Sequence, residues 1–84
     1  MKKIAVISAI LENPQLNQKD FNEIVSSYNS IVKGRMGLPF DDIAIAVISI
    51  TVIGTMDQIN SLTGKLGKLS NVTVKTAISK KVIE

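Results

Sequence analysis

The side chains that could carry chemistry in this chain are few. Its 84 residues include no cysteine and no histidine, which excludes disulfides and thiolate sites and removes the commonest metal ligand and general base. Asp41-Asp42 is the one adjacent pair of acids. A hard-cation site would need about six oxygen ligands, so we interpret the pair as the charged start of a strand. Arg35, two residues from Lys33, could hold an anion. We expect no catalytic residue, no metal site and no cofactor.

The basic residues are too scattered to indicate a phosphate or nucleic-acid surface. The net charge of +3 bears mainly on solubility and does not by itself indicate a partner, and no block of five or six like charges occurs.

The run Thr63-Gly64-Lys65 is not a P-loop, because it lacks the four-residue spacer after a first glycine and the Ser or Thr after the lysine. We interpret it as a loosely packed helix end.

No pattern typical of export or of a membrane span is present. Met1-Lys2-Lys3 precedes apolar residues, as in a signal peptide, but that apolar run ends at Glu12-Asn13-Pro14 without a cleavage site. The longest uncharged apolar run covers eleven residues, 43–53, whereas a membrane helix needs about 20. We therefore expect an untargeted cytoplasmic protein that does not bind membranes.

That same run organises the rest of the chain. Residues 43–53 are mostly β-branched and lie between two acids and Gly54, which predicts a long central strand. Shorter apolar or alternating runs predict strands over residues 4–11, 31–36 and 72–78. Glycine and proline at 37–42 predict the turn of a hairpin between the second and third strands, with Gly37 free to adopt φ > 0.

Two segments have helical periodicity. Phe21, Ile24, Val25 and Tyr28 recur at helical spacing, which predicts a helix from residue 16 to about 27–30. Asn13 with Pro14 or, alternatively, Asn17 with Asp20 could begin it.

A capping-box spacing at Thr55 and Gln58 starts the second helix, whose apolar stripe runs from Met56 to Leu69. Gly64 and Gly67 would each cost about 1 kcal/mol there, so either this helix ends early or something packs close to its backbone.

The order β-α-β-β-α-β predicts a ferredoxin-like α+β sandwich formed by a single domain, residues 1–84. Right-handed crossovers place both helices on one face of a four-stranded antiparallel sheet of order 4-1-3-2. A sheet covered on one face should alternate apolar and polar residues, yet both central strands are apolar on both faces. Ile4, Val6 and Ile10 face one way, opposite Ala5, Ile7 and Leu11. We therefore expect self-association through the sheet, as a homodimer or homotetramer. The alternative is that Ala, Ser and Thr residues on the second face allow it to remain exposed to water in a single chain.

Nucleic-acid binding by such a sheet requires aromatic residues on the central strands for base stacking, and these strands have none. We expect no direct nucleic-acid site.

Three short motifs add a family resemblance over nearly the whole chain. They are Arg35-Met36-Gly37-Leu38-Pro39, residues 62–67 (LTGKLG) and residues 72–76 (VTVKT). With the predicted element order and length, they resemble the small ACT-like family of iron-only hydrogenase system regulators. The resemblance implies a stand-alone, oligomeric ACT-like regulatory domain, similar to the C-terminal domain of the nickel-responsive regulator.

The resemblance implies no catalytic residues, and the nickel-binding histidines of that regulator have no counterpart here. An amino-acid ligand in the manner of ACT domains would sit by the first strand–helix loop at a subunit interface. This chain has Glu12-Asn13-Pro14 there and lacks the usual glycine. The candidate ligand-binding residues are Asn13 in that loop, Arg35 as the anion holder, and Gly37 in the first motif.

Three functions compete on these grounds. The first is a non-enzymatic, ligand-sensing regulatory domain, with a bearing on transcription, that acts as a homo-oligomer with an unidentified small-molecule effector. The second is a protein-interaction or assembly module without a small ligand. The third is a small enzyme that uses Arg35 to bind an anion.

Overall fold

The computed structural model describes residues 1–83. Glu84, the last residue of the predicted charged tail, lies outside the described residues. The elements, in chain order, are β1 (Lys3–Glu12), η1 (Pro14–Leu16), α1 (Gln18–Ser26), β2 (Val32–Phe40), η2 (Asp41–Ile43), β3 (Ile45–Gly54), α2 (Met56–Gly67) and β4 (Val72–Ile78). All four predicted strands and both predicted helices are present, and the bounds of β1 and β4 lie within one residue of those predicted.

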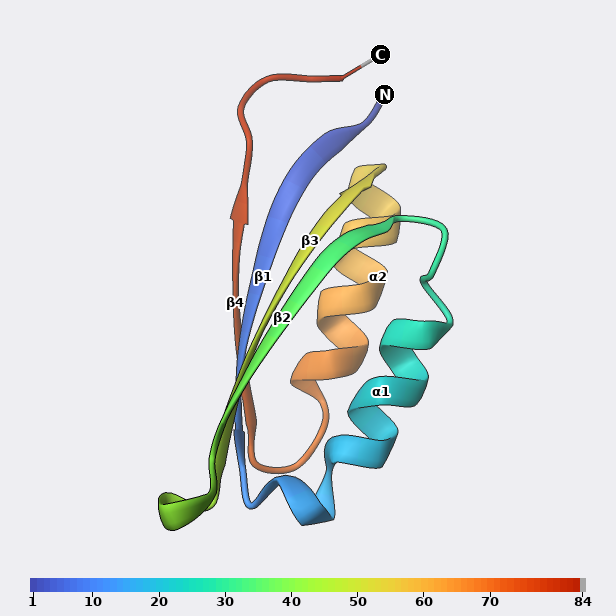
Figure 1. Cartoon of the computed structure of the whole chain (residues 1–84). Coiled ribbons are helices and arrows are strands. Elements are labelled where there is room, and N and C mark those ends of the chain that lie inside the picture. The colour runs from blue at the N-terminus through green and yellow to red at the C-terminus, as the bar shows by residue number, and fades with distance from the viewer. Residues whose placement is uncertain (84) are drawn as a thin grey trace.

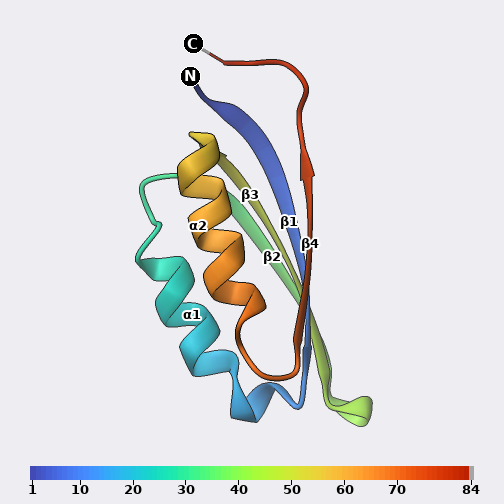
Figure 2. The same cartoon turned by 180° about the vertical axis from the view of Figure 1, so that it is seen from behind.

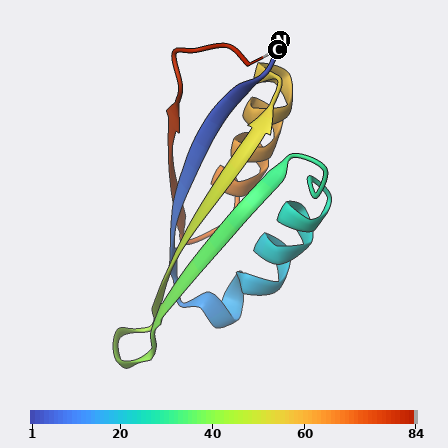
Figure 3. The same ribbon diagram turned by 45° about the horizontal axis from the view of Figure 1, so that its top comes forward.

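The sheet is antiparallel and has the order β2-β3-β1-β4, which confirms the predicted ferredoxin-like arrangement. Both helices lie on one face of it, and the hairpin that joins β2 and β3 projects beyond the rest of the molecule (Figures 1 and 2). The view in Figure 3 shows α1 beside β2 and α2 behind the central strands. The edge strand β2 and helix α1 therefore form one side of the molecule.

The core lies between the helices and one face of the sheet. Ala5, Ile7, Ala9 and Leu11 of β1 are buried there, as are Ile48, Ile50 and Val52 of β3. The helices contribute Phe21, Val25, Ile59, Leu62 and Leu66. The helix residues belong to the predicted apolar stripes, and the strand residues form one of the two apolar faces predicted for each central strand.

The opposite face of the sheet has no helix over it (Figure 2), and its side chains are largely apolar. We call it the outer face. Strand register places on it Ile4, Val6 and Ile10 of β1, Met36, Leu38 and Phe40 of β2, and Ile45, Val47 and Ile53 of β3. The first six are between 37% and 61% exposed. The two-sided apolar character predicted for the central strands is confirmed.

The predicted hairpin between β2 and β3 is confirmed, but its turn lies at residues 41–44 rather than 37–42. Gly37, Leu38 and Pro39 continue β2, paired with Ile48, Val47 and Ala46, and no glycine of the described chain has positive φ. Proline is tolerated because β2 is an edge strand, where one row of N–H groups needs no partner.

The chain turns instead at residues 41–44, where Ala44 takes the left-handed conformation (φ 52°) and its N–H donates to the Asp41 carbonyl at 3.3 Å. Ile43, the expected first residue of the third strand, lies in this turn.

The helix starts follow the sequence signals in part. Pro14 opens the short η1 after Asn13, and α1 begins after Asn17, so both predicted starts are used. Neither asparagine side chain caps its helix. The capping box of α2 is confirmed, because Thr55 Oγ1 accepts from the Gln58 N–H and Gln58 Oε1 accepts from the Thr55 N–H.

Among residues 1–83, no helix has the length and apolar content to cross a bilayer.

Of the two expectations for Gly64 and Gly67, close packing is wrong, because nothing lies within 4 Å of a Cβ built at either position. Helix α2 includes Gly64 and ends at Gly67, before Leu69, the last residue of the predicted stripe. The packing requirement falls on Gly54 instead, at the end of β3. A Cβ there would lie 2.8 Å from Gln58 Oε1 and 3.2 Å from Ile31 Cγ2. Gly54 thus leaves room for the glutamine that completes the capping box.

We predict opposite effects for two glycine-to-alanine substitutions. Gly54→Ala should lower the free energy of unfolding by about 1–3 kcal/mol, because the new methyl group displaces Gln58 and crowds Ile31. Gly64→Ala should raise it by about 0.5–1 kcal/mol, because the methyl group meets open space and alanine favours the helix. Urea unfolding followed by circular dichroism measures both. Equal effects of the two substitutions would contradict this account of Gly54.

Candidate functional site

Arg35 lies on the helix-covered face of the sheet because β2 contains an irregularity. Strand register shifts between Val32 and Gly34, so that Val32 pairs with Val52 while Arg35 pairs with Ile50. Val52 and Ile50 are both buried on the core side. Val32 and Arg35 therefore share a face although they are three residues apart. The irregularity breaks the alternation of an ordinary strand over residues 31–36, which would place Val32 and Arg35 on opposite faces.

Helix α1 holds the Arg35 guanidinium. Nη2 donates to Oδ1 of Asn22 at 2.6 Å, and the guanidinium carbon lies 5.8 Å from the centroid of the Phe21 ring. A planar guanidinium stacks well on an aromatic face, and its five N–H groups can bind a carboxylate with two parallel hydrogen bonds. Asn22 is the one side chain among residues 1–83 to which Arg35 donates. The group is thus positioned while part of its donor capacity still faces outward.

Arg35 and Gly37 line the same shallow groove between α1 and the end of β2. Its volume is about 200 Å³, and its other lining residues are Gln18, Leu38, Pro39, Ala46 and Ile48. No atom lies within 4 Å of a Cβ built on Gly37, so the backbone there borders open space. The groove combines one cation and one amide side chain with apolar walls. This arrangement suits a small anion with an apolar part, such as a carboxylate.

The structure does not bring Asn13 to this groove. Asn13 follows β1 in the left-handed conformation (φ 52°), and its N–H donates to the Ala44 carbonyl at 2.8 Å. Of the three candidate ligand-binding residues, Arg35 and Gly37 therefore lie together and Asn13 lies apart. No local sequence pattern indicated Gln18, Phe21 and Asn22 as neighbours of Arg35. Their spacing on one helix was visible, but the face of β2 that carries Arg35 was not.

A second residue missed by the sequence analysis is Asn17, the one buried polar residue described. Its Nδ2 donates to the carbonyls of Glu12 and Ser70, both at 3.1 Å. It thereby ties the end of β1 to the loop between α2 and β4. Its Oδ1 is buried and accepts no hydrogen bond from residues 1–83. The sequence indicated Asn17 only as a possible helix cap.

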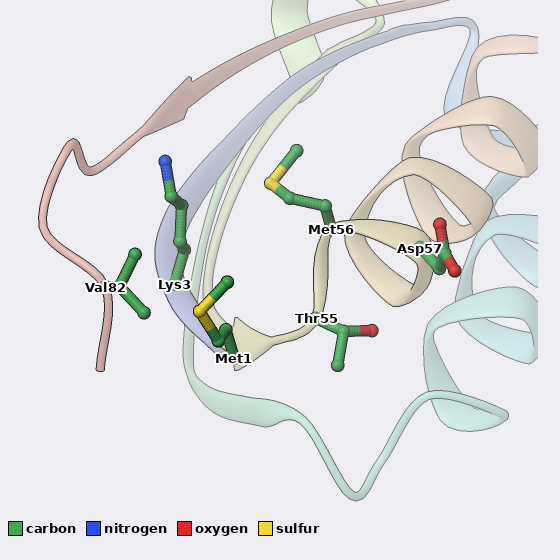
Figure 4. A pocket seen from close by; sticks show the side chains of 6 residues that line it. All are labelled: Met1, Lys3, Thr55, Met56, Asp57 and Val82. Atoms are coloured by element: carbon green, nitrogen blue, oxygen red, sulfur yellow. The ribbon is translucent and has the colours of Figure 1, made fainter. Parts of the chain in front are cut away.

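Another hollow, of about 340 Å³, lies where α2 begins, and its lining residues are Met1, Lys3, Thr55, Met56, Asp57 and Val82. Figure 4 shows Met56 turned toward the β1 side of the helix start, while Asp57 points to the other side. Its walls are mainly methionine and valine side chains, so it offers few groups for specific recognition.

A third hollow lies at the hairpin tip, between Pro39 and Ile43. Among residues 1–83, no three acidic, histidine or cysteine side chains gather as a metal site would require.

Tyr28 lies between the helices, and its hydroxyl has a lowered pKa. The Tyr28 hydroxyl shares a 2.6 Å hydrogen bond with the Ser61 hydroxyl, and the Lys65 ammonium lies 5.1 Å from the centre of the Tyr28 ring. The Lys65 ammonium and, after it, the Ser61 hydroxyl lower the pKa of Tyr28 from its ordinary value. This cluster joins the end of α1 to α2.

Comparison with known proteins gives one family and several solved structures. The sequence model of the TM1266-like family, described as a proposed iron-only hydrogenase system regulator, matches residues 3–76. No curated protein sequence matches the chain. The uncharacterized protein TM1266 from Thermotoga maritima superposes with a TM-score of 0.91 at 28% identity, covering 95% of this chain and 100% of that one.

Two further structures share the fold at lower identity. The ACT domain from the GTP pyrophosphokinase of Chlorobium tepidum superposes with a TM-score of 0.78 at 18% identity, over 92% of this chain and 100% of that one. The C-terminal domain of the MgtC protein from Mycobacterium tuberculosis gives 0.71 at 12% identity, over 96% and 92%. These similarities confirm the ACT-like α+β fold that the motifs suggested.

We predict that Tyr28 titrates at a lower pH than a free tyrosine and that Lys65→Met removes most of this shift. Phenolate absorbance in the near ultraviolet measures it without interference, because the chain has one tyrosine and no tryptophan. The contact makes the pKa of Tyr28 lower in the folded than in the unfolded chain, so it stabilises the fold in full above the ordinary tyrosine pKa. This contribution is lost as pH falls through the folded-state pKa. Lys68→Met is the control. A shift of equal size in the wild type and Lys65→Met would refute the assignment to Lys65.

Proposed function

Since this chain belongs to the TM1266-like family of proposed iron-only hydrogenase system regulators, we propose that it is a non-enzymatic regulatory domain that senses a small ligand as a homo-oligomer. An effect on transcription would then act through a partner protein, because the domain offers no base-stacking surface on its central strands. The assembly would be a homodimer or a homotetramer formed through the sheet.

The observation that carries this proposal is the bare outer face. Nine apolar side chains lie on it, from Ile4 on β1 to Phe40 on β2 and Ile53 on β3. Contiguous exposed apolar patches on monomers rarely exceed a few hundred Å² unless they bind something. A flat apolar sheet face matches the inner face of a two-sheet sandwich, in which sheets pack about 10 Å apart. A second copy of the chain provides such a sheet.

The Arg35 groove supports the sensing part of the proposal. It lies on the helix side of β2, so association through the outer face would leave it open to solvent. The Phe21 ring and Asn22 already order the guanidinium, which lowers the entropy lost when a ligand binds. A small carboxylate fits both the charge and the apolar walls. Of the candidate residues, Arg35 would bind the carboxylate, and Gly37 would allow its close approach.

One observation favours the second function, an assembly module without a small ligand. Ligand pockets usually enclose about 300–1,000 Å³, whereas this groove encloses about 200 Å³. A ligand would therefore be small or would need a wall from another subunit. Ligand screening separates the two functions.

We predict that the wild-type chain sediments as a dimer or tetramer at micromolar concentration. Val6→Lys should shift it to the monomer, because Val6 lies near the middle of the outer face, paired with Thr51, and a lysine there cannot be desolvated cheaply. Asn60→Lys, an exposed site on α2, is the control and should not change the mass. Circular dichroism checks that all three fold. A wild-type monomer would refute self-association.

We predict that at least one small carboxylate raises the melting temperature of the wild-type chain in a thermal-shift screen of amino acids and other organic acids. Arg35→Ala should abolish the shift, and Arg35→Lys should reduce it, because lysine lacks the planar pair of donors. Lys33→Ala removes a neighbouring charge and should keep the shift. The absence of any shift across the screen would favour the assembly module.

A further inference from the structure

The molecule is charged oppositely at its two ends. The hairpin tip carries Asp41 and Asp42, with the exposed apolar residues Phe40 and Ile43 beside them. The other end carries four lysines, Lys2, Lys3, Lys80 and Lys81, and the acid Asp57, which lines the same hollow as Lys3. The bridge between Lys2 and Ile83 holds the final segment against the start of β1. Figure 1 shows the hairpin tip and both termini at opposite ends of the molecule.

These two ends do not neutralise each other within one chain. The longest extent of the molecule is 43 Å, several times the Debye length of about 8 Å at physiological ionic strength. Each end therefore presents its own charge to a partner. The acidic tip also follows directly from β2 and β3, whose apolar residues form the outer face, and Glu12 lies on that face opposite Ile45. Lys75 of β4 also lies on this face, opposite Ser8 near its middle. The outer face thus has an acidic end and a basic end, with one further lysine between them.

Two copies that pack their outer faces together about a twofold axis have two aligned arrangements. If the axis runs along the strands, the two acidic tips meet each other and the two lysine ends meet each other. If the axis runs across the strands, each acidic tip meets the partner's lysine end. Like charges in contact cost free energy, and opposite charges set orientation and register. The charges therefore favour the second arrangement.

We propose that the chain forms an antiparallel, face-to-face dimer in which the Asp41–Asp42 tip of each copy lies against the Lys80–Lys81 segment of the other. This rests on the self-association in the proposed function and adds its orientation and its charged contacts. The contact is isologous, so it occurs twice and closes the assembly. Apolar groups accompany the charges, because Phe40 and Ile43 at the tip have exposed Met1 and half-buried Val82 as counterparts at the lysine end.

The test is a charge swap between the two ends. The tip variant is Asp41→Lys with Asp42→Lys, and the end variant is Lys80→Glu with Lys81→Glu. Each makes both charged contacts repulsive, so the dissociation constant should rise about tenfold or more at low salt and less at high salt. An equimolar mixture of the two variants should form a heterodimer, because both contacts are attractive again. The fourfold variant that combines all four changes should recover the homodimer.

Matched controls carry the same change in net charge on the helix side. Asp20→Lys with Glu23→Lys matches the tip variant, and Lys19→Glu with Lys68→Glu matches the end variant. All four control positions are exposed. The controls should associate as the wild type does. Sedimentation equilibrium gives the dissociation constants, native mass spectrometry identifies homodimers and heterodimers, and circular dichroism confirms that each variant folds.

The outcomes separate this proposal from the one it rests on. A wild-type monomer would overturn both self-association and its orientation. A wild-type dimer that responds equally to the swaps and to their controls would overturn the orientation alone, and an orthogonal or edge-to-edge assembly would then remain. If the tip variant binds the wild type more tightly than the wild type binds itself, the tips meet each other and the antiparallel arrangement is wrong. Weaker association of each variant alone, followed by recovery in the mixture and in the fourfold variant, supports it.

Discussion

Hydrophobic burial on one face of the sheet is the interaction on which this structure depends. Two helices supply Phe21, Val25, Ile59, Leu62 and Leu66 against the core side of β1 and β3, and this layer is complete. The same strands carry a second apolar set on the outer face, and residues 1–83 form no third helix to cover it. A domain of this size has a modest core. The apolar surface that a single chain leaves exposed on the outer face is therefore a large fraction of the apolar surface that the chain could bury.

Local patterns predicted most of the fold because they act over short distances. The uncharged, mostly β-branched run of residues 43–53 identified β3, whose two faces are both apolar, and the Thr55–Gln58 spacing identified the start of α2. The hairpin turn was misplaced because Pro39 and Gly37 suggest a break only when strand position is ignored. On the edge strand β2 they cost little, and Ala44, which no propensity would choose for φ 52°, turns the chain instead.

The candidate site was harder to predict, since it depends on pairing between elements. Arg35 reaches Phe21 and Asn22 only because the irregularity between Val32 and Gly34 changes which side of β2 faces the helices. A sequence gives no sign of such a shift, whose cause is the match between two strands. Asn17 shows the same limit. Its amide links two carbonyls that are 58 residues apart in the chain, those of Glu12 and Ser70, and no local motif encodes that link.

The central place of β1 has a consequence for the chain as it leaves the ribosome. Residues 3–12 are synthesised before their partners, residues 45–54 and 72–78. Until those segments emerge, the nascent β1 has apolar side chains on both faces and no strand on either edge. Pairing over such distances is slow and leaves the chain open to aggregation. Chaperone binding to this first segment would protect synthesis until β4 arrives.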